Sequence, residues 1–210
     1  SALARQDDDD GPHLIYLPER AFSVEQFVKD VKAAMKKYGR CVVAVSEGIT
    51  DKDGTPILAK FTSETDSHGN VQLSGTGALG DLLAKVVKEQ VGIKRVRADT
   101  FGYLQRSFPG IASESDAREA RLVGAAAVQA AVDDEMSGGS VAIRRKPSRK
   151  YGVVFKVVPL RRVAKETRRM PEAFINKAGN YVTPAFIEYA RPLVGELPPC
   201  ARFAQMRRMR

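Results

Sequence analysis

Two short apolar runs separated by one helical segment constrain the fold more than any other feature of the sequence. HLIYLPE at residues 13–19 and CVVAVSEG at residues 41–48 are strand-like, and the second is rich in β-branched side chains, as buried strands are. Between them, Ser23 and Gln26 have the spacing of a capping box that begins a helix, and Gly39 is placed to end it. Two strands joined by a helix form a parallel βαβ unit, which predicts an α/β fold.

The alternation of strand and helix patterns continues along the chain. Residues 49–78 are predicted to be a long surface excursion, that is, a loop without a helix or strand. The further elements that we predict are a helix at 78–92, a strand at 94–102, a helix at 113–135, and a hairpin formed by 140–146 and 151–160. The strands predicted to be parallel are 13–17, 41–46 and 95–101. The sequence therefore predicts a mostly parallel sheet with helices on both faces over residues 1–160, and a short helical C-terminal extension packed on it over residues 161–210.

The net charge of the chain narrows the kinds of molecule that it is expected to bind. The chain has 34 Lys and Arg against 25 Asp and Glu, a formal net charge of +9, so the partner is expected to be anionic. Nucleic acid, a membrane surface and a phosphorylated metabolite all qualify. The basic runs at 144–150 and 161–169 are more often solvated surface than specific sites. The chain has no run of about 18 apolar residues and no secretory leader pattern, so we expect a cytoplasmic location and no membrane partner.

Several kinds of catalytic and metal site have no support in the sequence. Cys41 and Cys200 are too few for a disulfide framework and lack metal-ligand spacing, and the two histidines stand far apart. LSGTGALG at 73–80 follows no convincing strand and lacks the Lys-Ser/Thr of a phosphate-binding loop. The acidic run at 7–10 suits a divalent cation, but such runs are more often simply solvated. We therefore predict no metal site and no catalytic residue in this chain.

Polar residues directly follow two of the predicted strands. SEG at 46–48 follows the strand at 41–46, and GYLQR at 102–106 follows the strand at 95–101. Ligands of parallel α/β sheets bind outside the carboxyl ends of the strands. We therefore expect the binding site at this edge of the sheet.

Four side chains near this edge suit a ligand that carries both hydroxyls and a phosphate. Ionised Glu47 accepts hydrogen bonds from sugar hydroxyls, whereas Arg97 and Arg106 bind phosphate. The Tyr103 phenol donates or accepts one further bond. Each residue alone also has a structural explanation: a lysine or helix-terminus partner for Glu47, an ordinary surface position for Arg97 and packing for Tyr103. The residues by themselves leave both readings open.

Several segments resemble a known family. They are SALAR at the start, IYLPE (15–19), VVAVSEG (42–48), FGYLQRS with ASESDAREA (101–107 and 112–120), and VVPLRRVAKETRRMPEAFI with EYARPLVGE (157–175 and 188–196). On these segments, which cover nearly the whole chain in order, the chain resembles the C-terminal part of a phosphofructokinase. The resemblance is closest to the pyrophosphate-dependent and long-chain branch.

The resemblance implies a 6-phosphofructokinase of glycolysis, a transferase that phosphorylates the 1-hydroxyl of fructose 6-phosphate from pyrophosphate or ATP. Residues 1–160 would be its sugar-phosphate-binding domain. In that family Glu47 would contact the sugar, and Arg97 would reach the sugar phosphate of a neighbouring subunit in a homo-oligomer, a dimer or larger. Tyr103 and Arg106 would bind the phosphate within their own subunit. Tyr103 stands where short ATP-dependent members carry histidine, which favours the pyrophosphate branch.

The chain departs from the family pattern in what it lacks. The family's glycine-rich donor-phosphate segment, its Asp motif for the catalytic base and its Met-Gly-Arg substrate motif are not found in these 210 residues. The Mg²⁺ ion that the family uses would be held mainly by that missing part. We therefore expect the chain to be catalytically incomplete alone, either as a fragment of a longer enzyme or as one of two chains.

A basic nucleic-acid-binding module is the alternative of a different class. It would bind nucleic acid through the basic runs at 144–150 and 207–210. These runs lack interleaved aromatic residues that would stack on bases, and no nucleic-acid-binding motif accompanies them. The sequence therefore favours the sugar phosphate over nucleic acid as the anionic partner.

Overall fold

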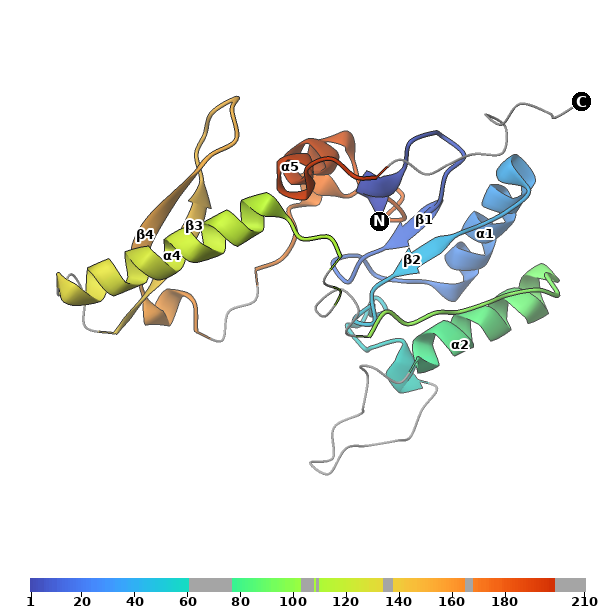
Figure 1. Ribbon diagram of the computed structural model, residues 1–210. Helices are drawn as coiled ribbons and strands as arrows, with labels where there is room; N and C mark the ends of the chain where they lie inside the picture. The colour runs from blue at the N-terminus through green and yellow to red at the C-terminus, as the bar shows by residue number, and fades with distance from the viewer. Residues whose placement is uncertain (61–76, 103–107, 109, 134–137, 165–167, 199–210) are drawn as a thin grey trace, which may run out of the picture. The chain divides into compact units, whose positions relative to one another are not determined.

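The computed structural model describes residues 1–60, 77–102, 108, 110–133, 138–164 and 168–198 (Figure 1). The chain folds as two units. The first unit is Ser1–Ile111 with Arg168–Tyr189, and the second unit is Ala112–Thr167 with Ala190–Arg210. Each unit contains residues from both sides of the boundary predicted at residue 160. The division into a domain over 1–160 and an extension over 161–210 stays a prediction.

A parallel strand pair forms the centre of the first unit. Strand β1 (Leu14–Tyr16) pairs with strand β2 (Val43–Val45), and Ile15 lies opposite Ala44 in the register. Helix α1 (Val24–Tyr38) connects the two strands. The parallel pairing predicted for residues 13–17 and 41–46 is confirmed.

Local signals set the ends of α1. The Ser23 hydroxyl accepts a hydrogen bond from the Gln26 backbone N–H at 3.3 Å, as the capping pattern predicts. Gly39 ends the helix with a φ of 68°, in the left-handed region, and its N–H donates to the Met35 carbonyl. A side chain at position 39 would be strained in this conformation.

The third predicted parallel strand is not formed. Helix α2 (Ala78–Val86) continues into the π-helical turn η3 (Val87–Val91), which confirms the helix predicted at 78–92. The described residues 93–102 then form a coil with no strand, so the strand predicted at 95–101 is wrong as an element of this structure. A strand requires a neighbour for its backbone hydrogen bonds, and no strand among the described residues pairs with this segment.

Helices and short segments cover both faces of the β1–β2 pair. On one face, Tyr16 belongs to the main core with Phe27 of α1 and Leu83 of α2. On the other face, Ile15 packs with Val182, next to the start of helix α5 (Pro184–Val194). The α/β class with cover on both sheet faces is thus confirmed. The remaining short helices are η1 (Ala2–Ala4), η2 (Leu58–Lys60), η4 (Leu160–Arg162) and η5 (Glu172–Phe174).

The second unit combines one long helix with a β-hairpin. Helix α4 (Glu114–Val132) packs against the antiparallel strands β3 (Gly139–Arg145) and β4 (Val153–Pro159), which confirms the predicted hairpin (Figure 1). Glu119 is 6% exposed, and its carboxylate accepts a 2.6 Å hydrogen bond from the Tyr151 hydroxyl. Burial, with the neighbouring Glu119 carboxylate, raises the pKa of Tyr151 to about 12. This bond ties the hairpin to α4.

The capping bond of α1 provides a test of the fold. We expect Ser23→Ala to lower the free energy of unfolding by about 1 kcal/mol, because the Gln26 N–H loses its acceptor. Ser23→Asp keeps an acceptor and is the matched control. Urea unfolding followed by circular dichroism measures both variants. An equal loss in the two variants would show that the cap is not the cause.

Candidate functional site

A large cavity runs along β2 in the first unit. Its volume is about 1450 Å³, and its walls come from β2, from α1 and α2, and from the coil at 95–102. Glu47 and Arg97 both line it. The structure therefore brings together the two predicted site residues that it describes. Tyr103 and Arg106 lie outside the described residues.

Glu47 occupies a turn that is anchored on both sides. Before it, the Ser46 N–H donates to the Tyr16 carbonyl at 3.1 Å, so the turn begins at the end of the β1–β2 pair. After it, Ile49 is fully buried and its N–H donates to the Ser46 carbonyl at 3.3 Å. The half-buried Glu47 carboxylate thus lies on a rigid frame at the carboxyl end of β2, where a ligand is expected.

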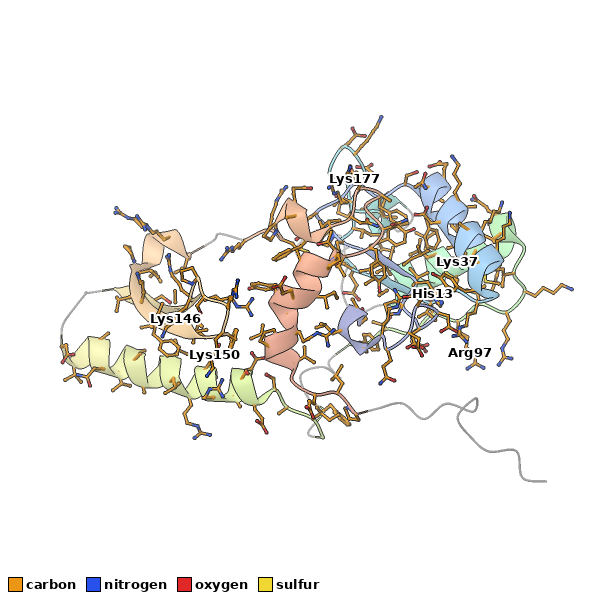
Figure 2. All side chains as sticks on the ribbon, turned by 90° about the horizontal axis from the view of Figure 1, so that it is seen from above. His13, Lys37, Arg97, Lys146, Lys150 and Lys177 are labelled. Atoms are coloured by element: carbon orange, nitrogen blue, oxygen red, sulfur yellow. The ribbon has the colours of Figure 1, made fainter. Side chains whose placement is uncertain are left out.

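Arg97 lies on the coil that follows α2 and η3. The coil is held against the helix because Val96 packs on the main core and Ala98 lies close to Gly80. A Cβ atom at Gly80 would come within 3.0 Å of the Ala98 Cβ, so this approach depends on glycine. Arg97 itself is exposed and lies at the periphery of the first unit (Figure 2). An exposed guanidinium on an anchored coil is free to meet a group from outside the unit.

Further charged residues line the same cavity. Arg40 and Arg95 add positive charge to that of Arg97, and Asp99 and Glu47 add negative charge. Arg40 and Arg95 were not among the site residues predicted from the sequence, although Arg95 stands two residues before Arg97 in the same RVR run. A wall with both signs of charge suits a ligand that carries hydroxyls and an anionic group.

Cys41 lines the cavity but is no nucleophile at neutral pH. The thiol is half-buried, and burial raises the pKa of Cys41 to about 11. A thiol with this pKa stays protonated at neutral pH, and only the thiolate reacts readily. Cys41 is therefore a packing residue of the cavity wall.

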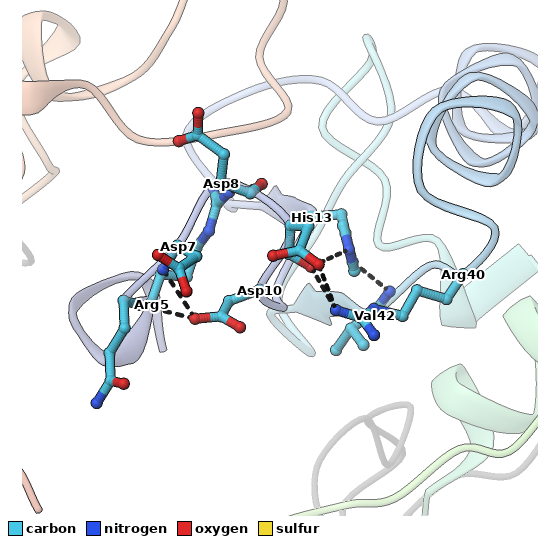
Figure 3. Close-up of polar contacts among 9 residues, drawn as sticks. Arg5, Asp7, Asp8, Asp10, His13, Arg40 and Val42 are labelled. Atoms are coloured by element: carbon cyan, nitrogen blue, oxygen red, sulfur yellow. Dashed lines mark hydrogen bonds and ion pairs between the residues drawn. The ribbon is translucent and has the colours of Figure 1, made fainter. Parts of the chain in front are cut away.

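The acidic run at 7–10 forms an ordered turn (Figure 3). The Asp10 carboxylate accepts 2.9 Å hydrogen bonds from the backbone N–H groups of Gln6 and Asp7. Asp9 pairs with Arg40, which donates to its carboxylate at 3.1 Å and to its carbonyl at 2.9 Å. Within the part of the chain that the structure describes, no three His, Cys, Asp or Glu side chains form a group that could hold a metal ion.

His13 joins this turn to the beginning of β2. Its Nδ1 accepts a 2.9 Å hydrogen bond from the Val42 N–H, and its Nε2 lies 3.2 Å from the Asp9 carbonyl (Figure 3). With Nδ1 as acceptor, Nε2 is the ring nitrogen that can donate to the Asp9 carbonyl. Its place at the start of the strand pair gives His13 a structural role.

Of the helices that are described, none has the length and apolar character needed to cross a bilayer.

The fold is an α/β unit with a cavity along β2 that charged residues line, and comparison with known proteins identifies its family. Residues 4–131 match the phosphofructokinase family. The chain is 56% identical over 203 residues to a pyrophosphate–fructose 6-phosphate 1-phosphotransferase of Rhodospirillum rubrum, covering 96% of this chain and 50% of that protein. A protein of the same name from Xanthomonas campestris is 38% identical over 94% of this chain and 46% of its own length.

A solved structure agrees with this result. The crystal structure of a pyrophosphate-dependent phosphofructokinase from Nitrosospira multiformis superposes with a TM-score of 0.70 at 31% identity. The match covers 90% of this chain and 42% of that one. The chain belongs to the phosphofructokinase family, as its motifs predicted, and it spans about half the length of the curated relatives it matches.

Proposed function

We propose that the chain is the fructose 6-phosphate-binding portion of a pyrophosphate-dependent phosphofructokinase. The observation that carries the proposal is the 56% identity to a pyrophosphate–fructose 6-phosphate 1-phosphotransferase over 96% of this chain. In the reaction, the 1-hydroxyl oxygen of the sugar attacks a phosphorus of pyrophosphate, the bond to the bridging oxygen breaks, and phosphate leaves. The hydroxyl proton passes to a base that this chain does not supply.

The four candidate residues divide the recognition of the sugar phosphate. Glu47, on its anchored turn, accepts hydrogen bonds from sugar hydroxyls. Tyr103 and Arg106 bind the 6-phosphate within the subunit, and Arg97 reaches the phosphate bound to a neighbouring subunit. The exposure of Arg97 supports this last role, because a residue that serves a neighbour must project from its own unit.

The remaining expectations follow from the same proposal. The enzyme uses Mg²⁺, and the part of the enzyme outside this chain supplies most of its ligands. It acts in the cytoplasm as a homo-oligomer, a dimer or larger, and it binds neither membrane nor nucleic acid. Pyrophosphate is preferred over ATP as donor, because relatives that match nearly the whole chain carry pyrophosphate in their names.

The preference for pyrophosphate over ATP as phosphoryl donor is tested in the complete enzyme. Purified enzyme with Mg²⁺ and fructose 6-phosphate should release fructose 1,6-bisphosphate with pyrophosphate as donor and much less with ATP. Aldolase-coupled oxidation of NADH measures the product. Equal or greater turnover with ATP would assign the protein to the ATP-dependent branch.

Arg97 is tested against its neighbour on the same coil. In the complete enzyme, Arg97→Ala should raise the KM for fructose 6-phosphate about tenfold, through loss of a charge-assisted hydrogen bond. Lys94→Ala removes an exposed cation from the same coil that is not among the described residues lining the cavity, and it is the matched control, with a KM near that of the unaltered enzyme. A similar rise in both variants would indicate a general effect of positive charge.

Shared sites are tested by mixing subunits. Subunits carrying Arg97→Ala, reassembled with subunits carrying Arg106→Ala, should regain activity, since some mixed sites combine an unaltered Arg106 with an unaltered Arg97 from the neighbour. Each variant reassembled with itself is the control. If the mixture is no more active than its components, Arg97 serves its own subunit.

A further inference from the structure

The positive charge of the chain is concentrated on the β3–β4 hairpin and on the short helix η4 that follows it. Residues 138–164 contain eight Lys and Arg and no Asp or Glu, so this segment carries eight of the nine net positive charges. Its cations are Arg144, Arg145, Lys146, Arg149, Lys150, Lys156, Arg161 and Arg162. In the rest of the chain, cations and acids nearly balance. The positive field of the protein therefore comes mainly from one element of the second unit.

Most of these cations are exposed. Arg145 is half-buried, and its guanidinium lies over the Tyr151 ring at 4.7 Å from the ring centre. The other seven cations are all exposed. Ala142 lies opposite Lys156 in the register, and residues two apart on a strand share a face. Arg144 and Lys156 therefore lie on the same face of the hairpin.

The turn between β3 and β4 has a defined shape. The Lys146 N–H donates to the Gly152 carbonyl at 2.9 Å and extends the pairing of the two strands. Inside the turn, the Ser148 N–H donates to the Lys146 carbonyl at 2.9 Å, and the Ser148 hydroxyl donates to the Lys150 carbonyl at 2.6 Å. Lys146, Arg149 and Lys150 thus extend from a folded turn (Figure 2). Binding through such a turn costs less ordering of the backbone than binding through a loose tail.

The seven exposed cations form no ion pair with another described residue. The ion pairs of the described part of the chain lie elsewhere, as between Arg20 and Glu172 and between Arg40 and Asp9. In the second unit, the buried Glu119 carboxylate accepts a hydrogen bond from Tyr151. Like charges that are close together repel one another, so a ligand with many negative charges would relieve this repulsion.

The aromatic residues of the hairpin do not suit nucleic acid. Proteins that bind single strands without sequence preference stack the bases on aromatic side chains. Tyr151 and Phe155 are half-buried, and the Tyr151 hydroxyl is bound to Glu119. The exposed cations therefore lack a stacking surface on the hairpin, and the polyanion that they suit is one without bases.

The face that carries Arg144 and Lys156 does not suit a membrane surface either. Segments that bind the interface combine cations with apolar side chains that insert between lipids. Ala142 and Val154 share this face and are half-buried, whereas the exposed Ile143 lies on the opposite face. Guanidinium and ammonium groups without exposed apolar neighbours suit a chain of phosphates that carries no acyl groups.

We propose that the β3–β4 hairpin binds inorganic polyphosphate, the unbranched chain of phosphate units of which pyrophosphate is the shortest member. The phosphate oxygens accept charge-assisted hydrogen bonds from the exposed Lys and Arg side chains of residues 144–162. This site lies on the second unit, whereas Glu47 and Arg97 line a cavity of the first unit. The proposal goes beyond the proposed function and does not depend on it.

Binding of end-labelled, long-chain polyphosphate to the complete enzyme tests the proposal. Fluorescence anisotropy is measured over a range of salt concentrations. The triple variant Lys146→Gln, Arg149→Gln, Lys150→Gln should bind at least about tenfold more weakly than the unaltered enzyme. The slope of log affinity against log salt should fall by about 2, because three phosphate contacts of about 0.7 each are lost. Unchanged affinity in this variant, or no binding to the unaltered enzyme, would overturn the proposal.

A matched variant removes the same charge from another surface. Lys29→Gln, Lys32→Gln, Lys36→Gln takes three exposed cations from α1 and lowers the net charge equally. Its affinity for polyphosphate should stay within about twofold of that of the unaltered enzyme. An equal loss of affinity in the two triple variants would assign the binding to overall charge and overturn the proposal.

A charge-conserving variant guards against a change in the shape of the turn. Lys146→Arg with Lys150→Arg keeps both charges and should bind polyphosphate about as tightly as the unaltered enzyme. A loss as large as that of the hairpin triple variant would show that charge is not the cause and overturn the proposal. Far-ultraviolet circular dichroism checks that each variant is folded.

Competing ligands distinguish the hairpin from other sites. Pyrophosphate at a concentration that saturates turnover should leave most of the polyphosphate bound, and full displacement would place the polymer in the donor site and overturn the proposal. Single-stranded RNA or anionic phospholipid vesicles that bind the hairpin as tightly, at equal phosphate concentration, would also overturn it. The hairpin triple variant should keep its turnover with pyrophosphate. Polyphosphate binding without turnover in any preparation would support the hairpin site and count against the proposed function only.

Discussion

No turnover of fructose 6-phosphate is expected from the 210-residue chain assayed alone, with Mg²⁺ and either pyrophosphate or ATP. Phosphoryl transfer depends on groups that hold the donor phosphates and the metal and on a base near the sugar hydroxyl. The sequence contains no glycine-rich donor loop and no catalytic Asp motif of the family, and the described residues contain no cluster of metal ligands. Binding the sugar without these groups does not lower the barrier to transfer.

The measurement compares three preparations in the same coupled assay. The chain alone should match a mock preparation from cells that lack it, whereas the chain co-expressed with the unmatched part of a relative should convert fructose 6-phosphate in the presence of Mg²⁺. Addition of EDTA to the reconstituted enzyme should abolish conversion. Steady turnover by the chain alone, above the mock preparation, would show that it carries a donor site of its own.

Arg106→Ala is expected to raise the KM for fructose 6-phosphate in the complete enzyme by about 30- to 150-fold, the equivalent of about 2–3 kcal/mol. The reason is that the proposed charge-assisted, bidentate hydrogen bonding of the Arg106 guanidinium to the 6-phosphate is lost. Tyr103→Phe removes a single neutral hydrogen bond and should raise the KM by about tenfold or less. Initial rates over a range of sugar phosphate concentrations measure both variants.

A structural role for Arg106 makes a different prediction. If Arg106 pairs with a nearby acid such as Glu114 or Asp116 at the start of α4, then Arg106→Ala lowers the thermal stability and leaves the KM unchanged. Thermal unfolding and KM are therefore measured on one variant. A normal KM would remove Arg106 from the site, whatever the change in stability.

The family and two candidate site residues could be predicted from the sequence because their signals are contiguous. The turn at 46–48 and its strand are neighbours in the chain, so the rule that ligands bind at strand ends led directly to Glu47. Arg97 was predicted from its place in the strand-like run before GYLQR, and the structure places it with Glu47 on the wall of one cavity. The size of that cavity had no signal in the sequence, because its walls come from segments that are separated along the chain.

The sequence by itself determined the elements whose hydrogen bonds are local. The Ser23 cap and Gly39 set the ends of α1 through bonds that span three or four residues, and the β3–β4 hairpin pairs residues that follow each other closely. Only the tertiary structure decided what depends on distant partners. Ile49, in a segment predicted to be a surface excursion, is fully buried as a member of the main core that also holds residues of α1 and α2. Residues 95–101 remain a coil because a strand exists only beside another strand.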